Sequence, residues 1–307
     1  MLRNTHNSTR ARGLRRGAFA LVGLLVVGCT VVPPEEDGVL NTLAGLILVP
    51  GASCDQLQDM FDVGYLPVAG IPTDAGVPFE EHWLPVGERD ILHVWYLPAE
   101  LDRGLIVLSP GSAGPMNCYL FPANLLVTQG WSVVMYEYEG YGYSSGTPSF
   151  SNLYRDLQTA FDWGLQRSGR SEATLMGVSL GSIPSVALAV DQPERVNGLV
   201  LDSPVALGAE FARFGLVLGN RPDAYKDLLE PELVSDELIK QVREPLLVFA
   251  HGRDLLTPPS TVQSLFDAAP GEKRLVFFNE LNHARGVYVQ TTDYAAYLDQ
   301  FLSPLWK

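Results

Sequence analysis

The stretch ATLMGVSLG, residues 173–181, is the most informative part of the sequence because it joins an apolar strand, a tight turn and the start of a helix. The apolar run at 173–176 predicts a strand, and the apolar spacing over 180–190 predicts a helix that begins at once. A G-x-S-x-G motif in this context holds its serine on a strained turn, so the residues two positions away must lack bulk. We therefore predict that Ser179 is presented as a nucleophile. The backbone N–H of Leu180, at the helix N-terminus, should then face developing negative charge.

On both sides of this stretch, strand-like and helical segments alternate from about residue 80 onward. We predict strands at 91–97, 104–108, 131–136, 196–201, 245–250 and 274–278, and helices at 117–129 and 152–167. Apolar strands that alternate with helices indicate a mostly parallel sheet covered on both faces. Residues 204–244 interrupt this alternation and read as helical and partly apolar, which predicts a small helical cap. Functional side chains are expected at the carboxyl ends of the strands.

The same motif occurs a second time, at Gly142-Tyr143-Ser144-Ser145-Gly146. It also follows a predicted strand, so the pattern alone does not exclude it. However, the chain continues as Thr147-Pro148-Ser149, which predicts a loop where the motif requires a helix. We interpret this copy as a glycine-rich loop near the rim of the site.

A serine hydroxyl needs a neighbouring base before it acts as a nucleophile. His283 lies in the loop after the last predicted strand, where the chain order serine, acid, histidine requires the base. Asp254 follows the strand before it and is the first choice for the acid that orients the imidazole. Asp202, one strand earlier, is the alternative acid. We interpret His251 as structural, and we place His82 and His93 in early strands.

A second N–H donor for a developing oxyanion should come from the loop after the strand at 104–108. That loop reads SPGSAG, residues 109–114, and its small residues let the backbone approach a substrate closely. Ser112 N–H is our choice, with Ala113 N–H as the alternative.

Taken together, these residues resemble the α/β-hydrolase superfamily over roughly residues 77–303. The loop GYGYSSGTPS, residues 140–149, is similar to one in the Bem46-like group, which includes depalmitoylase-type ABHD serine hydrolases. Gly111-Ser112-Ala113-Gly114 stands where that group carries His-Gly-Asn-Ala-Gly, so the usual histidine is absent here. The resemblance implies an α/β-hydrolase fold and the hydrolysis of carboxylic esters or thioesters.

The leading hypothesis is therefore a serine hydrolase that acts through an acyl-enzyme on a small-molecule or lipid-like ester. No metal-ligand cluster, phosphate-binding loop or nucleotide motif is recognised in the sequence, so no cofactor is expected. A serine peptidase of the same fold is one alternative. A non-catalytic envelope lipoprotein that keeps the scaffold is another, because fold alone does not give function.

The first 28 residues have the pattern of an export signal. Five arginines and no acidic residue precede a short apolar run that ends at Gly28-Cys29. Val26-Val27-Gly28-Cys29 resembles a bacterial lipobox, which implies a lipid on Cys29. We expect a tether and N-terminal segment at 29–76 and the hydrolase domain at 77–307. The protein should then lie in the bacterial cell envelope, anchored to a membrane and facing the periplasm, with secretion as the alternative.

The charge of the chain excludes one class of partner. Without residues 1–28, sixteen basic and thirty-five acidic side chains remain, a net charge of −19. Such a surface repels phosphate backbones and anionic headgroups, so we predict no nucleic-acid binding and an attachment that depends on the lipid. Once Cys29 is lipidated, Cys54 and Cys118 remain, and they are expected either to pair in an oxidising periplasm or to stay as buried thiols.

Overall fold

The computed structural model describes residues 48, 50–52, 54, 70–209 and 233–306. The predicted signal segment, Cys29 and most of the predicted cap lie outside these residues. In the described part of the chain, no helix is long and apolar enough to span a membrane.

A single eight-stranded sheet forms the centre of the molecule, in the order β1-β2-β4-β3-β5-β6-β7-β8. The strands are β1 Glu80–Val86, β2 Asp90–Leu97, β3 Gly104–Ser109, β4 Trp131–Tyr136, β5 Ala173–Val178, β6 Val196–Asp202, β7 Leu246–His251 and β8 Lys273–Phe278. The pairings β1–β2 and β2–β4 are antiparallel, and the six strands from β4 to β8 are parallel. The predicted fold class, a mostly parallel α/β sheet, is confirmed.

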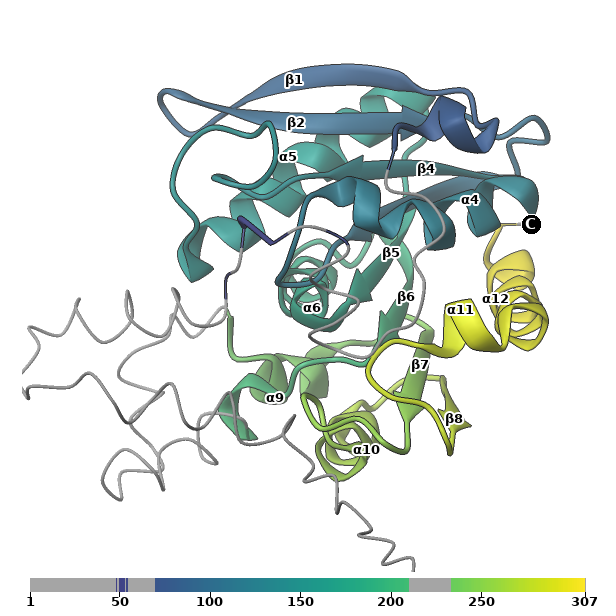
Figure 1. The fold of residues 1–307 in the computed structure, drawn as a ribbon. Helices are drawn as coiled ribbons and strands as arrows, with labels where there is room; N and C mark the ends of the chain where they lie inside the picture. The colour runs from purple at the N-terminus through teal and green to yellow at the C-terminus, as the bar shows by residue number, and fades with distance from the viewer. Residues whose placement is uncertain (1–47, 49, 53, 55–69, 210–232, 307) are drawn as a thin grey trace, which may run out of the picture.

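Helices cover both faces of this sheet (Figure 1). The longer ones are α4 Leu120–Thr128, α5 Phe150–Ser168, α6 Ser182–Asp191, α10 Pro259–Ala268 and α12 Thr291–Leu305. Short helical segments are η1 Pro72–Ala75, η2 Met116–Tyr119, η3 Ser179–Gly181, α9 Ser235–Leu238, η5 Ile239–Gln241 and α11 Gly286–Val289.

Two separate hydrophobic cores explain why the inner strands are apolar along their whole length. Leu105 and Val107 of β3 pack in one core with α5, α6 and α10. The alternate residues Ile106 and Leu108 pack in the other with α4 and α12. Successive side chains of a strand point to opposite faces, so a strand buried on both sides must be apolar throughout.

The chain also carries a covalent link between its N-terminal segment and the sheet. Cys54 and Cys118 form a disulfide, with their Cα atoms 5.3 Å apart. Of the two states that the sequence left open, the structure therefore has the paired one. Cys118 lies in η2, directly after the loop at 109–114.

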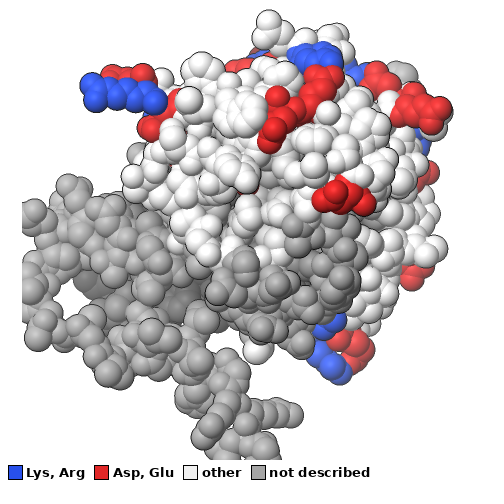
Figure 2. Space-filling view, turned by 45° about the horizontal axis from the view of Figure 1, so that its top comes forward, with Lys and Arg blue, Asp and Glu red and all other residues white. Residues whose placement is uncertain are grey.

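The surface view shows one face of the molecule in which white, uncharged residues predominate (Figure 2). Among the described residues of that face, basic side chains stand in small separate groups beside acidic ones.

Candidate active site

The turn between β5 and α6 presents Ser179 in the way that its motif predicts. Ser179 has a φ of +51°, a left-handed conformation that is strained for a residue with a side chain. A Cβ atom on Gly177 would lie 2.5 Å from the carbonyl oxygen of Gly181, and one on Gly181 would lie 2.2 Å from that of Ser109. Both are contacts with backbone that cannot move aside, so only glycine fits at these two positions.

The acid and the base meet at the carboxyl ends of β7 and β8. Asp254 Oδ2 lies 2.7 Å from His283 Nδ1, and both side chains are buried. Asp254 Oδ1 accepts hydrogen bonds from the backbone N–H groups of Leu256 and Thr257, each at 2.9 Å. Burial alone would raise the pKa of Asp254, but the charge of His283 and the hydrogen bonds from His283 and Thr257 hold it below its usual value. The carboxylate is therefore ionised at neutral pH and fixed in place.

Asp202, the alternative acid, is directed elsewhere. Its Oδ2 accepts a hydrogen bond of 2.8 Å from the hydroxyl of Tyr294 on α12. The geometry thus pairs His283 with Asp254, and it leaves Asp202 as a second buried carboxyl beside the site.

His251 is structural, as its position beside Asp254 suggested. The backbone N–H of Gly286 donates to His251 Nε2 at 2.9 Å, so Nδ1 carries the proton and donates to Ser203 Oγ at 2.9 Å. Burial lowers the pKa of His251 to about 3, which keeps the ring neutral. Ser203 Oγ in turn accepts the N–H of Ala284 at 3.0 Å. The buried side chains of His251 and Ser203 therefore hold the backbone of the residues that follow His283.

The loop after β3 is held by three tyrosine hydroxyls, a role that the sequence did not predict for these residues. Tyr138 donates to the carbonyl of Pro110 at 2.9 Å, Tyr141 to that of Ser112 at 2.9 Å, and Tyr119 to that of Ala113 at 3.2 Å. With these carbonyls bound to tyrosines, the loop has a fixed conformation, although it lacks the histidine that the Bem46-like group carries there. For Tyr138 and Tyr141, the sequence signal was the density of tyrosines between 136 and 143; Tyr119 lies outside that range.

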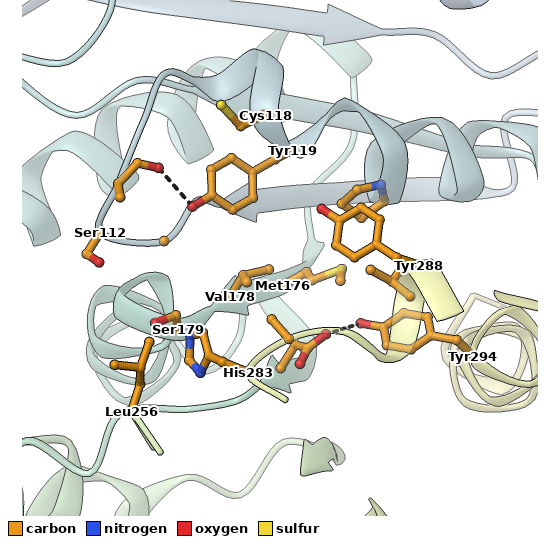
Figure 3. A pocket seen from close by; sticks show the side chains of 16 residues that line it. Ser112, Cys118, Tyr119, Met176, Val178, Ser179, Leu256, His283, Tyr288 and Tyr294 are labelled. Carbon is orange, nitrogen blue, oxygen red and sulfur yellow. Dashed lines mark hydrogen bonds between the residues drawn. The ribbon is translucent and has the colours of Figure 1, made fainter. Parts of the chain in front are cut away.

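A cavity of about 70 Å³ brings these parts together, and Ser112, Ser179 and His283 all line it. In Figure 3, Ser179 and His283 lie at one end, and Tyr288 and Tyr294 lie at the other. Met176 and Val178 lie between the two ends. Leu180, the other predicted donor residue, has a buried side chain at the start of the helical turn after Ser179.

The second motif copy forms a structural loop. Ser144 Oγ accepts the backbone N–H of His93 at 2.8 Å and donates to the carbonyl of Glu137 at 2.7 Å. This hydroxyl therefore links the loop to β2 and to the end of β4. Of the two tyrosines in that region, Tyr141 is buried and holds the loop after β3, whereas the side chain of Tyr143 is 77% exposed. From the sequence, Tyr141, Tyr143, Phe211 and Phe214 are candidates either for lining an acyl pocket or for packing in the core. Neither tyrosine lines the cavity, and both phenylalanines lie outside the described residues.

Comparison with known proteins gives the family. A family model described as serine aminopeptidase, S33, matches residues 101–221. An uncharacterised protein of Mycobacterium tuberculosis is 32% identical over 236 residues, which cover 71% of this chain and 78% of that protein. The α/β hydrolase domain-containing protein aho-3 of Caenorhabditis elegans is 33% identical over 154 residues, 48% of this chain and 42% of that protein. The chain belongs to the α/β-hydrolase family.

Solved structures agree with this α/β-hydrolase assignment at the level of the fold. An esterase of Pyrococcus furiosus superposes with a TM-score of 0.65 at 16% identity, covering 78% of this chain and 97% of that one. Membership in the family supports hydrolysis as the activity of this α/β hydrolase. Among its described residues, no group of three or more histidine, cysteine or acidic side chains is arranged to hold a metal ion.

Proposed function

We propose that this α/β hydrolase cleaves a carboxylic ester or thioester through an acyl-enzyme on Ser179. One observation carries the proposal: the strained turn of Ser179 opens on the cavity that His283 also lines, and His283 is bound to Asp254 at 2.7 Å. A serine, a base and an orienting acid in this relation are the parts that nucleophilic acyl transfer needs.

In the proposed reaction, Ser179 Oγ attacks the ester carbonyl while His283 Nε2 takes the serine proton. The Nδ1–H bond to Asp254 selects this tautomer and stabilises the imidazolium that forms. The N–H groups of Leu180 and Ser112 hold the oxyanion, with Ala113 N–H as the alternative second donor. His283 returns the proton to the leaving alcohol or thiol, and water then releases the acid by the same steps.

Labelling with a fluorophosphonate tests this proposal, since the reagent reacts with an activated serine. Wild-type protein and Ser144→Ala should label, and Ser179→Ala should not. The Ser144→Ala variant loses two hydrogen bonds and should be less stable by about 1–3 kcal/mol. If wild-type protein does not label, a non-catalytic lipoprotein becomes the better explanation. If only Ser144→Ala fails to label, the second motif holds the nucleophile.

A serine peptidase is the second candidate, because the matching family model is described as an aminopeptidase. A series of p-nitrophenyl esters of increasing chain length, assayed beside aminoacyl p-nitroanilides, separates the two activities. We expect kcat/KM for the best ester to exceed that for the best anilide by at least ~100-fold, about 2.7 kcal/mol in transition-state binding. The reverse order would favour the peptidase.

We also propose that Cys29 carries the lipid that anchors the protein to the membrane of a bacterial envelope. The lipobox-like Val26-Val27-Gly28-Cys29 supports this. The acidic charge balance of the chain supports it too, because anionic headgroups repel negative charge. The Cys54–Cys118 disulfide fits an oxidising compartment such as the periplasm.

A further inference from the structure

Thr257 is a buried threonine beside the Asp254–His283 pair, and the proposed reaction gives its side chain no role. It follows Asp254 by three positions, in the loop between β7 and α10, and it is 3% exposed. Its hydroxyl donates to Asp254 Oδ2 at 2.8 Å, the same oxygen that accepts the Nδ1–H of His283 at 2.7 Å. The oxygen of this hydroxyl also lies 3.4 Å from His283 Nδ1. Thr257 therefore flanks the hydrogen bond that joins the acid to the base.

Thr257 holds both oxygens of the Asp254 carboxylate. Its backbone N–H donates to Oδ1 at 2.9 Å, as does the N–H of Leu256, while its hydroxyl donates to Oδ2. Hydrogen bonds to both oxygens prevent the carboxylate from turning about its Cβ–Cγ bond. Pro258 and Pro259 follow at the start of α10, and their rings restrict the backbone of this turn. The hydroxyl therefore helps to fix the direction in which Oδ2 faces His283.

The same hydroxyl affects how strongly Asp254 attracts the proton of His283. A hydrogen bond donated to an ionised carboxylate stabilises its negative charge. Burial raises the pKa of Asp254, but the charge of His283 and the hydrogen bonds from His283 and Thr257 together bring it below its usual value. A carboxylate that is stabilised in this way is a weaker acceptor for a further proton donor. Without the Thr257 hydroxyl, His283 should therefore keep its imidazolium proton up to a higher pH.

We propose that Thr257 is a positioning residue for the acyl transfer at Ser179: its hydroxyl aligns Asp254 with His283 and keeps His283 neutral, as a general base must be, down to a lower pH. The inference rests on the proposed function and adds to it a residue that touches neither the substrate nor the reacting atoms. A threonine with a purely structural role would stabilise the fold without setting the pH at which the base becomes active.

Two other titratable side chains act electrostatically on His283. Burial raises the pKa of Asp202, at the end of β6, to about 7, and burial lowers the pKa of His251, at the end of β7, to about 3. Asp202 therefore titrates in the pH range that matters for His283, whereas His251 stays neutral there. Both side chains are retained in every variant of the test below, so a difference between two pH profiles comes from the substituted residue.

The pH dependence of kcat/KM for p-nitrophenyl butanoate tests the inference. In Thr257→Val, which removes the hydroxyl and keeps the shape, we expect the midpoint of the acid limb to rise by about 0.5 pH unit or more. On the plateau, kcat should fall by ~3-fold or more while KM stays within ~2-fold. Thr257→Ser keeps the hydroxyl and should restore the wild-type limb. The matched control Thr261→Val removes a hydroxyl of α10 that donates to the Pro258 carbonyl at 2.8 Å, and it should have the wild-type profile.

A thermal melt shows whether each variant is folded; if Thr257→Val is not, the smaller Thr257→Ala takes its place. An acid limb that stays in place or moves to lower pH without the hydroxyl overturns the inference, even where Tm falls. So does an equal rise in Thr257→Ser, which would trace the effect to packing, or in Thr261→Val, which would trace it to a general loosening of the loop. In each of these outcomes the wild type still cleaves the ester and labels on Ser179, whereas failure of the proposed function leaves the wild type without either activity.

Discussion

At the scale of single residues, the two buried aspartates beside His283 differ because their hydrogen bonds differ. Asp254 accepts from His283, Thr257 and the backbone, and these bonds hold its pKa down against burial. Asp202 accepts a hydrogen bond from Tyr294, and burial raises its pKa to about 7. The same residue type is thus a fixed anion in one place and a titrating group in the other.

The raised pKa of Asp202 predicts how its contribution to stability depends on pH. Between about pH 4 and pH 7, the folded protein keeps a proton on Asp202 that the unfolded chain has lost, so stability falls as pH rises. The amide side chain introduced by Asp202→Asn does not titrate. The free energy of unfolding of the wild type, minus that of Asp202→Asn, should therefore drop by on the order of 3 kcal/mol across this range. Urea unfolding at several pH values measures it. A constant difference would contradict the prediction, and Asp293→Asn is the exposed control.

At the scale of elements, the β5–α6 turn depends on the absence of two side chains. Gly177 and Gly181 let the strand, the turn and Ser109 of β3 approach closely enough to expose Ser179. The strain at Ser179 is matched on the neighbouring loops, where Ser203 and Ala284 also have positive φ values, of +50° and +51°. Strained backbone that gathers at one site is typical of functional sites.

Gly181→Ala should destroy this turn, because the added methyl would lie 2.2 Å from the Ser109 carbonyl oxygen. We expect a loss of about 3 kcal/mol or more in stability and loss of fluorophosphonate labelling. Gly169→Ala is the control for the loss of a glycine without a close contact: φ is +70° there, against −60° at Gly181, but nothing lies within 4 Å of the new atom. It should cost about 1–2 kcal/mol and keep the labelling. Equal effects of the two substitutions would show that the close approach does not matter.

At the scale of the whole molecule, one covalent link joins the N-terminal segment to the sheet domain near the site. The Cys54–Cys118 disulfide closes a loop of 64 residues, and Cys118 itself lines the cavity. Closing a loop of this length restricts the unfolded chain.

Removing this link with Cys54→Ser/Cys118→Ser should lower the free energy of unfolding by about 2–4 kcal/mol. Dithiothreitol should bring the wild type to the same value and leave the double variant unchanged, as thermal melts would show. If the reductant lowers the Tm of both proteins equally, its effect does not come from this disulfide.

The proposed lipid anchor on Cys29 also belongs to the scale of the whole molecule. Cys29→Ser should move most of the protein from the membrane fraction to the soluble fraction of the cell, because a mature chain with a net charge of −19 has no electrostatic attraction to anionic lipid. Cell fractionation and immunoblotting measure this, with Cys54→Ser as the cysteine control. Retention of Cys29→Ser in the membrane fraction would contradict the lipid anchor.

The order of the strands from β2 to β8 and the place of the turn at Ser179 could be predicted from the amino-acid sequence. The predicted strands at 104–108 and 131–136 agree with β3 and β4 within one residue, and the others differ only at their ends. These features are local: apolar periodicity and two glycines around a serine act over a few residues, so they can be seen without the rest of the fold. The choice of His283 as the base followed from its place after the last predicted strand, where the chain order serine, acid, histidine requires it.

Tertiary structure alone decided which carboxyl meets His283, which tyrosines hold the loop after β3, and that Asp202 and Tyr288 face the cavity of Ser179. These contacts join residues far apart in the chain, such as Asp202 and Tyr294, which are separated by 92 positions. Whether two such side chains form a hydrogen bond depends on strand register and helix packing. These fix the distance between the two side chains, and a small change in that distance makes or breaks the bond. No local pattern carries that information, because Asp202 and Asp254 both follow a buried strand in the sequence.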